Sequence, residues 1–458
     1  MLYTAGKTFS SLSGQWQNRG DRLGLCSLSF LYLFLPLSLL VYWACPFPLR
    51  PKALLLLSFA FYYGAEGWAG LGLMFFVLFS DWMLAGRLLG SRNAKLRQAF
   101  VACAVIKNIG IFIGYHILSP HIPLGLGVYC MTSLGYVLDC YHGFAIWGKD
   151  PSRVLLMSAF FPKLAAGPIV YYGRIVPQFF SLRVTLSSIG EGGSIFLLGL
   201  FKKVILGDSM AVLFRSLHDI PKYEISLLGI WSMLISLSFA LYFSLWGFCQ
   251  MAEGLALMFG FRISENFNNP FLSQSINEFF GRFNSTINRF IRRHVYMPLG
   301  GAKGNSLSMV CNIFILSVCM ASWFSLRPNI LIWGIFLSFF VMIEGYLLPR
   351  GWKNIASFFQ WLYCAFVIQF SMIFWAGDSL SESFSYLRIL FRGASGLDDR
   401  SIYLLVSNYL VIILCCLFAL GLPQKAALWV KRIFPGPAAI GEILFNSLLL
   451  TAVTAYLL

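Results

Sequence analysis

The chain has 458 residues, of which 58% are apolar and only 11% are charged. Soluble domains carry roughly a quarter charged residues, so this composition excludes an ordinary soluble protein. A mean hydropathy of +0.75, together with apolar runs of membrane-spanning length, predicts a polytopic α-helical membrane protein. The 34 Lys and Arg against 18 Asp and Glu give a net charge of +16. In a membrane protein this charge indicates positive-inside topology and anionic lipid before it indicates nucleic acid.

The first 22 residues are polar and show no periodicity, so we expect a polar N-terminal segment (1–24) followed by a single membrane domain (25–458). The apolar runs predict about eleven or twelve membrane helices. They lie near residues 25–47, 53–69, 71–90, 99–118, 122–147, 194–217, 227–260, 307–325, 329–348, 355–376, 402–421 and 438–458. The run 227–260 is too long for one perpendicular crossing, so it is predicted to be tilted, broken or two elements.

Basic residues in short loops predict the orientation. Arg50 and Lys52 follow the first span, and the loop 87–97 follows the third, so both loops are expected to face the cytoplasm. The basic segment 262–303 is expected on the same side, with the N-terminus outside. The glycine run 190–193 lacks a following Lys-Ser/Thr, so it is not a phosphate loop and is predicted to be a turn before the sixth span.

Two segments are neither spans nor ordinary loops. Residues 150–180 are apolar but interrupted by Pro and Gly, which predicts a re-entrant or interfacial element that protein or water must cover. In residues 264–301, apolar side chains between Phe280 and Ile291 fall on one helical face. Basic side chains fall on another face, and this pattern predicts an amphipathic helix with a basic stripe.

Cysteine and histidine bear on metal chemistry. The eleven cysteines include no C-x-x-C pair and mostly lie in apolar runs, where a free thiol acts as a small hydrophobic side chain. We therefore expect no metal site and no bound cofactor. Only five histidines are present, so imidazole chemistry has few sources.

A set of short motifs recurs in a characteristic order. In the segment 265–301 they are Glu265-Asn266-Phe267-Asn268, Pro270-Phe271, the run Phe279–Phe283, and Tyr296-Met297-Pro298-Leu299-Gly300-Gly301. Elsewhere they are Phe34-Leu35-Pro36, Phe160-Phe161-Pro162, Ala166-Gly167-Pro168-Ile169, Phe201-Lys202-Lys203 with Asp208, Leu257–Phe261, Trp333-Gly334 and Gly377-Asp378-Ser379. In this order and spacing the chain resembles the membrane-bound O-acyltransferase superfamily. The resemblance is to its bacterial branch, which contains the alginate O-acetylation membrane subunit and the D-alanyl transfer protein of teichoic acids.

The resemblance implies a bowl of membrane helices around a central funnel, in the bacterial cytoplasmic (inner) membrane. An acyl thioester, either acyl-CoA or an acyl carrier protein, approaches from the cytoplasm in that family. The acyl group then reaches an acceptor hydroxyl on the opposite side, often through a partner protein. The partners implied here are membrane lipid, an acyl carrier protein and a secreted or membrane-anchored acyl acceptor, but no nucleic acid. The basic stripe formed by Arg282, Arg289 and Arg293 becomes the candidate donor-binding surface, suited to CoA phosphates or an acidic carrier.

The chain departs from the family where the chemistry needs a base. Acyl transfer requires removal of a hydroxyl proton, usually by His, and family members carry His at three motif positions. Those positions are Asn284, Phe324 and Leu337 in this chain.

A second departure lies in the family's Tyr-Phe-Asp-Phe-Ser-Gly-Tyr-Ser-Asp run. Here two carboxylates and a phenol are replaced by Ser244, Gln250 and Phe248. Loss of these groups together indicates altered or impaired proton transfer.

Three residues remain as candidates for catalytic roles. The amide of Asn284 is suited to orienting a substrate or holding an oxyanion, although it cannot act as a base. Glu253 follows Gln250 by three residues, so both are expected to face one cavity, with Glu253 as the proton acceptor. His294 is a base only if the chain turns it inward. The structural alternatives are a polar contact between helices for Asn284 and an interfacial position for His294.

Other intramembrane acids have simpler explanations. Asp208 shares its helix with Lys202 and Lys203, which predicts an ion pair, and Glu344 is expected to pair with Arg350.

Two functions therefore remain open. One is a divergent O-acyltransferase that moves an acyl group from a cytoplasmic thioester to a cell-surface polysaccharide or lipid-linked acceptor. The other is a catalytically silent relative that binds an acyl donor or lipid, or scaffolds a cell-envelope polysaccharide modification complex. A transporter is disfavoured because inverted repeats are not evident.

Overall fold

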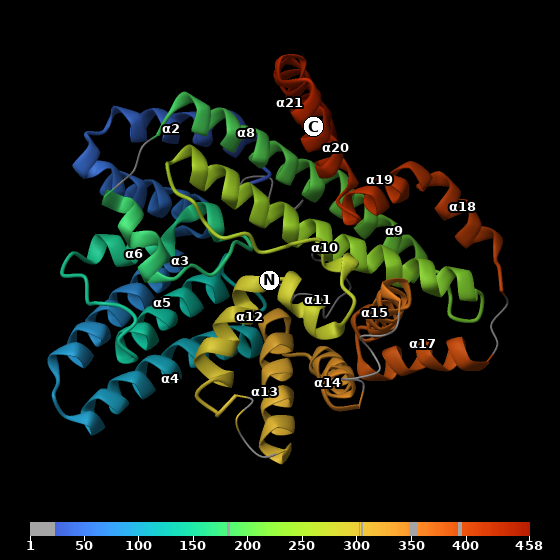
Figure 1. Ribbon diagram of the computed structural model, residues 1–458, viewed down its shortest axis with the longest axis horizontal. Helices are drawn as coiled ribbons and strands as arrows, with labels where there is room; N and C mark the ends of the chain where they lie inside the picture. Colours follow the sequence, from blue (N-terminus) through green and yellow to red (C-terminus); the bar gives the residue numbers. More distant parts are fainter. Residues whose placement is uncertain (1–22, 181–183, 302, 304–305, 348–355, 393–395) are drawn as a thin grey trace.

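The computed structural model describes residues 23–180, 184–301, 303, 306–347, 356–392 and 396–458. Across these ranges the chain is helical, and none of the described residues forms a β-strand (Figure 1). Six described helices are long and apolar enough to cross a membrane, and a bent pair, Asp399–Ser407 with Tyr409–Ala419, makes a seventh if it is one span. The predicted all-α polytopic membrane fold is confirmed. Residues 1–22 of the predicted polar segment lie outside the described residues, and the single-domain division stays a prediction.

The first part of the chain forms short and long helices in alternation. They are η1 (Phe30–Phe34), α2 (Leu35–Ala44), η2 (Phe47–Leu49), α3 (Arg50–Gly90), α4 (Ala94–Leu118), α5 (Leu126–Tyr141), α6 (Pro151–Ala159), η3 (Phe161–Lys163), α7 (Tyr172–Ile175) and η4 (Val176–Phe180). The predicted spans 53–69 and 71–90 are the two halves of α3. They meet at Gly67, whose φ of 72° and ψ of −170° interrupt the helix at an angle that glycine tolerates and other residues do not.

The middle of the chain contributes four helical elements. They are α8 (Leu186–Phe201), η5 (Lys202–Gly207), α9 (Asp208–His218) and α10 (Leu227–Met258). Of the three alternatives for the run 227–260, the structure shows one unbroken helix of 32 residues. At about 1.5 Å per residue it is roughly 48 Å long, so it must tilt or protrude from a hydrocarbon core of about 30 Å.

Glycine contacts join α8 to α10, which lie side by side across the molecule (Figure 1). A Cβ placed on Gly254 would lie 2.5 Å from the Gly192 carbonyl oxygen, and one on Gly247 would lie 2.6 Å from that of Gly199. Small residues allow helix backbones in a membrane to approach this closely. The prediction of a turn at 190–193 is therefore wrong, because these glycines lie inside α8 and some of them pack against α10.

The last part of the chain completes the helical assembly. Its elements are η6 (Pro270–Leu272), α11 (Ile276–Arg282), α12 (Ser285–Ile291), η7 (Arg292–Tyr296), α13 (Ser306–Phe324), α14 (Pro328–Met342), η8 (Ile343–Leu347), α15 (Ser357–Ser371), α16 (Ile373–Ala376), α17 (Leu380–Arg392), α18 (Asp399–Ser407), α19 (Tyr409–Ala419), α20 (Leu422–Ile433) and α21 (Pro435–Leu457). Among the described residues, the predicted spans 53–69 and 71–90 are joined across the interruption at Gly67, and the apolar helices 30–44 and 441–457 are shorter than a full span.

Two apolar cores meet along α10. The first contains α2 to α6 and the C-terminal half of α10, and the second contains α9, the N-terminal half of α10 and α11 to α17. The predicted re-entrant segment packs into this interior. Nearly all side chains from Val154 to Ile169 are buried, so protein covers the irregular backbone as its apolar character requires.

Candidate functional site

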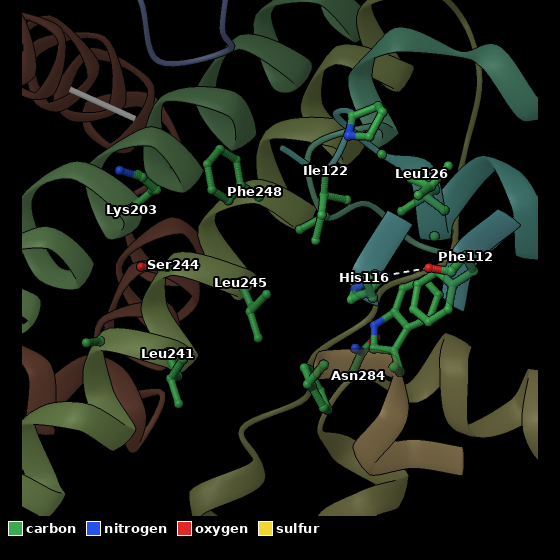
Figure 2. Close-up of a pocket in the computed structure, with 18 of the residues that line it drawn as sticks. Phe112, His116, Ile122, Leu126, Lys203, Leu241, Ser244, Leu245, Phe248 and Asn284 are labelled. Carbon is green, nitrogen blue, oxygen red and sulfur yellow. Dashed lines mark hydrogen bonds between the residues drawn. The ribbon is translucent and has the colours of Figure 1, made fainter. Parts of the chain in front are cut away.

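A cavity of about 130 Å³ lies where the two cores meet. Its wall is formed by α4 and the start of α5 on one side, by η5, α9 and α10 on another, and by the break before α12 and the end of α13 on the third. The lining residues are Phe112, His116, Ile122, Pro123, Gly125, Leu126, Gly127, Val128, Ala166, Lys203, Asp208, Ala211, Ala240, Leu241, Ser244, Leu245, Phe248, Asn284, Trp323 and Phe324. Figure 2 shows Ser244, Leu241 and Leu245 facing His116 and Asn284 across it.

The cavity collects most of the positions at which the motifs predict a departure from the family. Asn284 and Phe324, two of the three predicted histidine replacements, both line it, as do Ser244 and Phe248 of α10. Leu337 is fully buried outside its wall. Gln250 is also outside the wall, since its Oε1 accepts a hydrogen bond from Lys202 Nζ at 2.6 Å. Positions separated by up to 80 residues in sequence, from Ser244 to Phe324, therefore share one cavity.

The local chain geometry at Asn284 explains how its side chain reaches the cavity. Asn284 has φ 49° and ψ 51°, a left-handed conformation that Asn adopts more readily than most residues. This residue separates α11 from α12. The prediction of one amphipathic helix with a continuous basic stripe is therefore wrong, because the helix ends at Arg282 and restarts at Ser285 in a new direction.

Asn266 holds this break together. Its Nδ2 donates to Asn284 Oδ1 at 2.8 Å, and its Oδ1 accepts from the backbone N–H of Thr286 at 2.9 Å and from the Thr286 hydroxyl at 2.8 Å. The Ser285 N–H donates to the Asn266 carbonyl at 2.9 Å. Because Asn284 Oδ1 is occupied by Asn266, its amide N–H groups are the polar atoms left for the cavity.

His116 also lines the cavity, and motif comparison did not single it out. It lies one turn before the end of α4, is 1% exposed, and its Nδ1 lies 2.8 Å from the Phe112 carbonyl oxygen. A sequence signal existed, because an ionisable side chain inside an apolar span is a functional candidate by default.

Two charged residues in the wall neutralise each other. Lys203 Nζ lies 2.5 Å from Asp208 Oδ2, which confirms the predicted pairing of Asp208 with this lysine region. A smaller apolar cavity of about 30 Å³ adjoins the first and shares Leu241, Leu245 and Phe324 with it. The accessible surface of this smaller cavity is apolar, so the cavity suits an acyl chain better than a charged group.

The other two predicted catalytic residues lie outside this cavity. Glu253 is half-buried on α10, one turn beyond Gln250, with Glu265 and Lys202 as electrostatic neighbours. His294 lies on η7, where its side chain is 2% exposed and its Nε2 is 3.7 Å from Asp139 Oδ1. Glu344 caps α11 by accepting from the Ile276 N–H at 2.6 Å. Its predicted partner, Arg350, lies outside the described residues.

The surroundings of His294 favour the uncharged form of its imidazole. Burial, with Arg293 and His142 nearby, lowers its pKa from 6.5 to about 4. The ring packs against Phe290 at 4.8 Å between centroids. At neutral pH the imidazole is therefore uncharged and part of a packed cluster.

The three predicted donor-binding arginines do not form one surface. Arg282 pairs with Glu278 at 2.6 Å on α11, and Arg293 pairs with Asp139 at 2.7 Å. Arg289 lies near Arg174, and burial together with that guanidinium lowers the pKa of Arg289. Arg174 was missed because it comes from the irregular segment 150–180.

Arg174 of α7 and Arg289 of α12 lie close enough to interact electrostatically, and we call this pair the basic end. Among the residues that the structure describes, neither forms an ion pair. Arg174 Nη1 donates to Ser264 Oγ at 3.3 Å, and Arg289 contacts Ser285. Arg97 of the predicted cytoplasmic loop donates to the Tyr141 carbonyl at 3.3 Å, and the neighbouring Asp139 pairs with Arg293.

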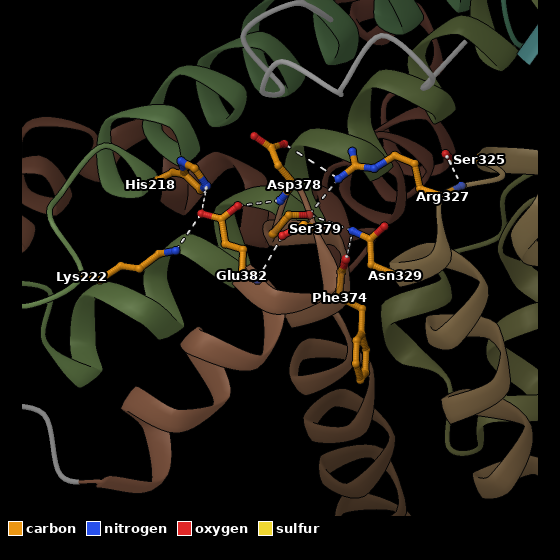
Figure 3. Close-up of polar contacts among 10 residues, drawn as sticks. His218, Lys222, Ser325, Arg327, Asn329, Phe374, Asp378, Ser379 and Glu382 are labelled. Atoms are coloured by element: carbon orange, nitrogen blue, oxygen red, sulfur yellow. Dashed lines mark hydrogen bonds and ion pairs between the residues drawn. The ribbon is translucent and has the colours of Figure 1, made fainter. Parts of the chain in front are cut away.

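A second polar cluster lies near the N-terminal end of α10. Glu382 pairs with Lys222 at 2.9 Å and accepts from the Asp378 N–H at 2.8 Å, while Arg327 Nη2 donates to the Gly377 carbonyl at 2.9 Å (Figure 3). His218 lies 3.8 Å from Glu382. Burial alone would raise the pKa of Glu382, but Lys222 and the Asp378 amide outweigh it and lower that pKa. These contacts fix the turns that follow Phe324 and Ala376, beside the two cavities.

The apolar helices define a multi-pass membrane protein, and a cavity lies between its two cores. Residues 151–387 match the family described as MBOAT, membrane-bound O-acyltransferase family. They make up more than half of the chain, so the chain belongs to this family, and the resemblance seen in the motifs is confirmed.

Its relatives are bacterial acyltransferases. The chain is 28% identical to the "Probable alginate O-acetylase AlgI" of Azotobacter vinelandii over 392 residues, covering 79% of this chain and 77% of that protein. It is 24% identical to the "Peptidoglycan O-acetyltransferase" of Helicobacter pylori over 425 residues, covering 81% and 80%. It is 25% identical to the "Teichoic acid D-alanyltransferase" of Bacillus subtilis over 311 residues, covering 62% and 77%. These relatives and the apolar helices indicate a protein of the bacterial inner membrane.

Proposed function

We propose that this protein is an O-acyltransferase that moves an acyl group from a cytoplasmic thioester to a hydroxyl of a cell-envelope polysaccharide, with an altered proton-transfer step. The observation that carries the proposal is the cavity itself. Asn284 and Phe324 line one cavity with Ser244 and Phe248, which supports a reaction chamber in which other groups take over from the motif histidines.

The basic end suits the donor. Arg174 and Arg289 place two guanidinium groups near each other, and neither is neutralised by a carboxylate among the described residues. Guanidinium groups bind phosphate oxygens in bidentate geometry. A phosphate of CoA, or of the pantetheine arm of an acyl carrier protein, would bind Arg289 and Arg174, with Arg293 and Arg282 held back by Asp139 and Glu278. The thioester is the substrate, and no resident cofactor is needed.

Asn284 would act on the thioester carbonyl. Its Oδ1 is held by Asn266, which leaves its amide N–H groups to donate to the oxygen as negative charge develops. One such donor lowers the barrier by about 3 kcal/mol in well-formed oxyanion sites. This contribution does not require the residue to titrate.

The alternative is a catalytically silent subunit that binds an acyl donor or lipid. Phe324 favours it, because the ring at a histidine position packs against Trp333 and Trp375 at 6.2 and 5.7 Å between centroids. An aromatic ring packed in this way fills space that a histidine would use for chemistry.

The test is acyl transfer by the purified protein in detergent or nanodiscs. Labelled acetyl-CoA and a loaded acyl carrier protein serve as donors, and alginate and peptidoglycan fragments serve as acceptors. We expect slow transfer by the unmodified protein and faster transfer by Phe324→His, which adds an imidazole to the cavity wall and leaves Asn284 in place. Leu337→His is the matched control outside the cavity and should give no gain. Donor binding by calorimetry without transfer in any variant would support the silent alternative.

A further inference from the structure

We propose that His116, on α4, is the general base of this cavity and replaces the histidines missing from the motif positions. The inference rests on the proposed acyl transfer and names the residue that would make it work. The chain has five histidines, and all of them are among the described residues. Of these five, only His116 lines the cavity.

The other four histidines are placed elsewhere. His121 Nε2 lies 2.7 Å from Glu66, and its side chain is 43% exposed. His142 is at the end of α5, His218 is near Glu382 in the second polar cluster, and His294 is near Asp139. None of these rings belongs to the wall that holds Asn284 and Phe324.

Hydrogen bonding selects the tautomer of His116. A carbonyl oxygen can only accept, so the 2.8 Å contact from Nδ1 to the Phe112 carbonyl places the ring proton on Nδ1. Nε2 then carries the lone pair and is the basic nitrogen. The Phe112 ring packs against the imidazole at 4.2 Å between centroids and fixes its orientation.

Figure 2 shows His116 and Asn284 on the same side of the cavity, facing α10. The two residues supply complementary functions, an imidazole nitrogen that accepts a proton and an amide that donates a hydrogen bond. No other lining group combines with Asn284 in this way, because the Asp208 carboxylate is paired with Lys203. A thioester carbonyl held near Asn284 would leave an acceptor hydroxyl within the same small space as His116.

The step then balances without a further reactant. The acceptor oxygen attacks the thioester carbonyl carbon, and its proton passes to His116 Nε2 as the C–O bond forms. The C–S bond breaks as the intermediate collapses, and the imidazolium returns the proton to the departing thiolate. The products are an O-acyl ester and a free thiol, and His116 is regenerated as the neutral imidazole.

The test compares His116→Asn with the unmodified protein and with His142→Asn, a matched change at an exposed histidine. Asn at 116 keeps a side-chain N–H near the position of Nδ1 but has no basic nitrogen. We expect the kcat/KM for acyl transfer to fall by about 10²- to 10⁴-fold in His116→Asn, the range for loss of a general base. The acid limb of the pH profile should also disappear in His116→Asn. His142→Asn should keep both the kcat/KM and the acid limb of the unmodified protein.

A second variant separates the lost base from a structural defect. Phe324→His added to His116→Asn should restore transfer, because it supplies an imidazole from another residue of the cavity wall and leaves Asn284 in place. Thermal unfolding confirms that each variant is folded, and His116→Gln replaces His116→Asn if that variant is not. A folded His116 variant with unchanged kcat/KM and pH profile would overturn the assignment while leaving the proposed function in place. An unmodified protein that binds donor but transfers nothing would overturn both.

Discussion

Replacing Asn266 by Ala should destabilise the protein and disable the cavity together. The Asn266 side chain is 2% exposed and makes hydrogen bonds to three groups around the helix break: Asn284 Oδ1 and the amide and hydroxyl of Thr286. Each buried polar group left without a partner costs about 1 kcal/mol or more. The three together predict a loss of about 3 kcal/mol in the free energy of unfolding. The neighbouring Asn268 has an exposed side chain, so Asn268→Ala is the matched control and should change the free energy by less than about 0.5 kcal/mol.

The assay is reversible unfolding in detergent micelles, followed by tryptophan fluorescence, with acyl transfer measured on the same preparations. Asn266→Ala should also reduce the rate of acyl transfer per folded molecule. The reason is that the hydrogen bond from Asn266 Nδ2 no longer holds Asn284 Oδ1 in place. Equal unfolding midpoints for Asn266→Ala and Asn268→Ala would refute the reasoning. The result would mean that the break at Asn284 is held by backbone geometry alone.

Three further predictions follow from contacts away from Asn266. Gly254→Val should destabilise the fold by about 1–3 kcal/mol, measured by unfolding in micelles, because its new side chain would meet the Gly192 carbonyl. His294→Phe should make stability less sensitive to acid. The folded pKa of about 4 lies below the ordinary 6.5, so the unfolded chain binds the proton more tightly and the unmodified protein loses up to about 3 kcal/mol as the pH falls from 6.5 to 4. Asp398→Ala should cost about 1 kcal/mol, seen as a lower melting temperature, because Asp398 Oδ1 accepts from the Ser401 N–H at 2.6 Å and caps α18.

Each of these has a result that would count against it. A Cβ on Gly190 meets nothing within 4 Å, so Gly190→Val is the control for Gly254→Val. Equal stability of the two variants would show that the α8–α10 contact has room for a side chain. Parallel pH–stability curves for His294→Phe and the unmodified protein would show that His294 does not titrate over this range. If Asp398→Ala and Asp398→Asn have the same melting temperature as the unmodified protein, the cap on α18 does not contribute to stability.

Much of the molecule was readable from local sequence. Each apolar run forms its own backbone hydrogen bonds in a membrane whatever its neighbours are, so the membrane helices and the all-α class follow from composition and length. The motifs identified the family, and they predict departures from it at Asn284, Phe324 and Leu337. The Lys203–Asp208 pair was also predictable, because both residues lie on neighbouring turns of one helical stretch.

Tertiary structure decided which of these residues meet. The break at Asn284 depends on Asn266, 18 positions earlier in the chain, so helical periodicity alone predicted one amphipathic helix there. The basic stripe divided because Glu278 and Asp139 each take one arginine, while Arg174 joins Arg289 from a distant irregular segment. The count of five histidines showed a shortage of imidazole. Only the packing of α4 against α3 and α5 placed one of them in the cavity, because the neighbours of a helix decide which of its faces turns toward a cavity.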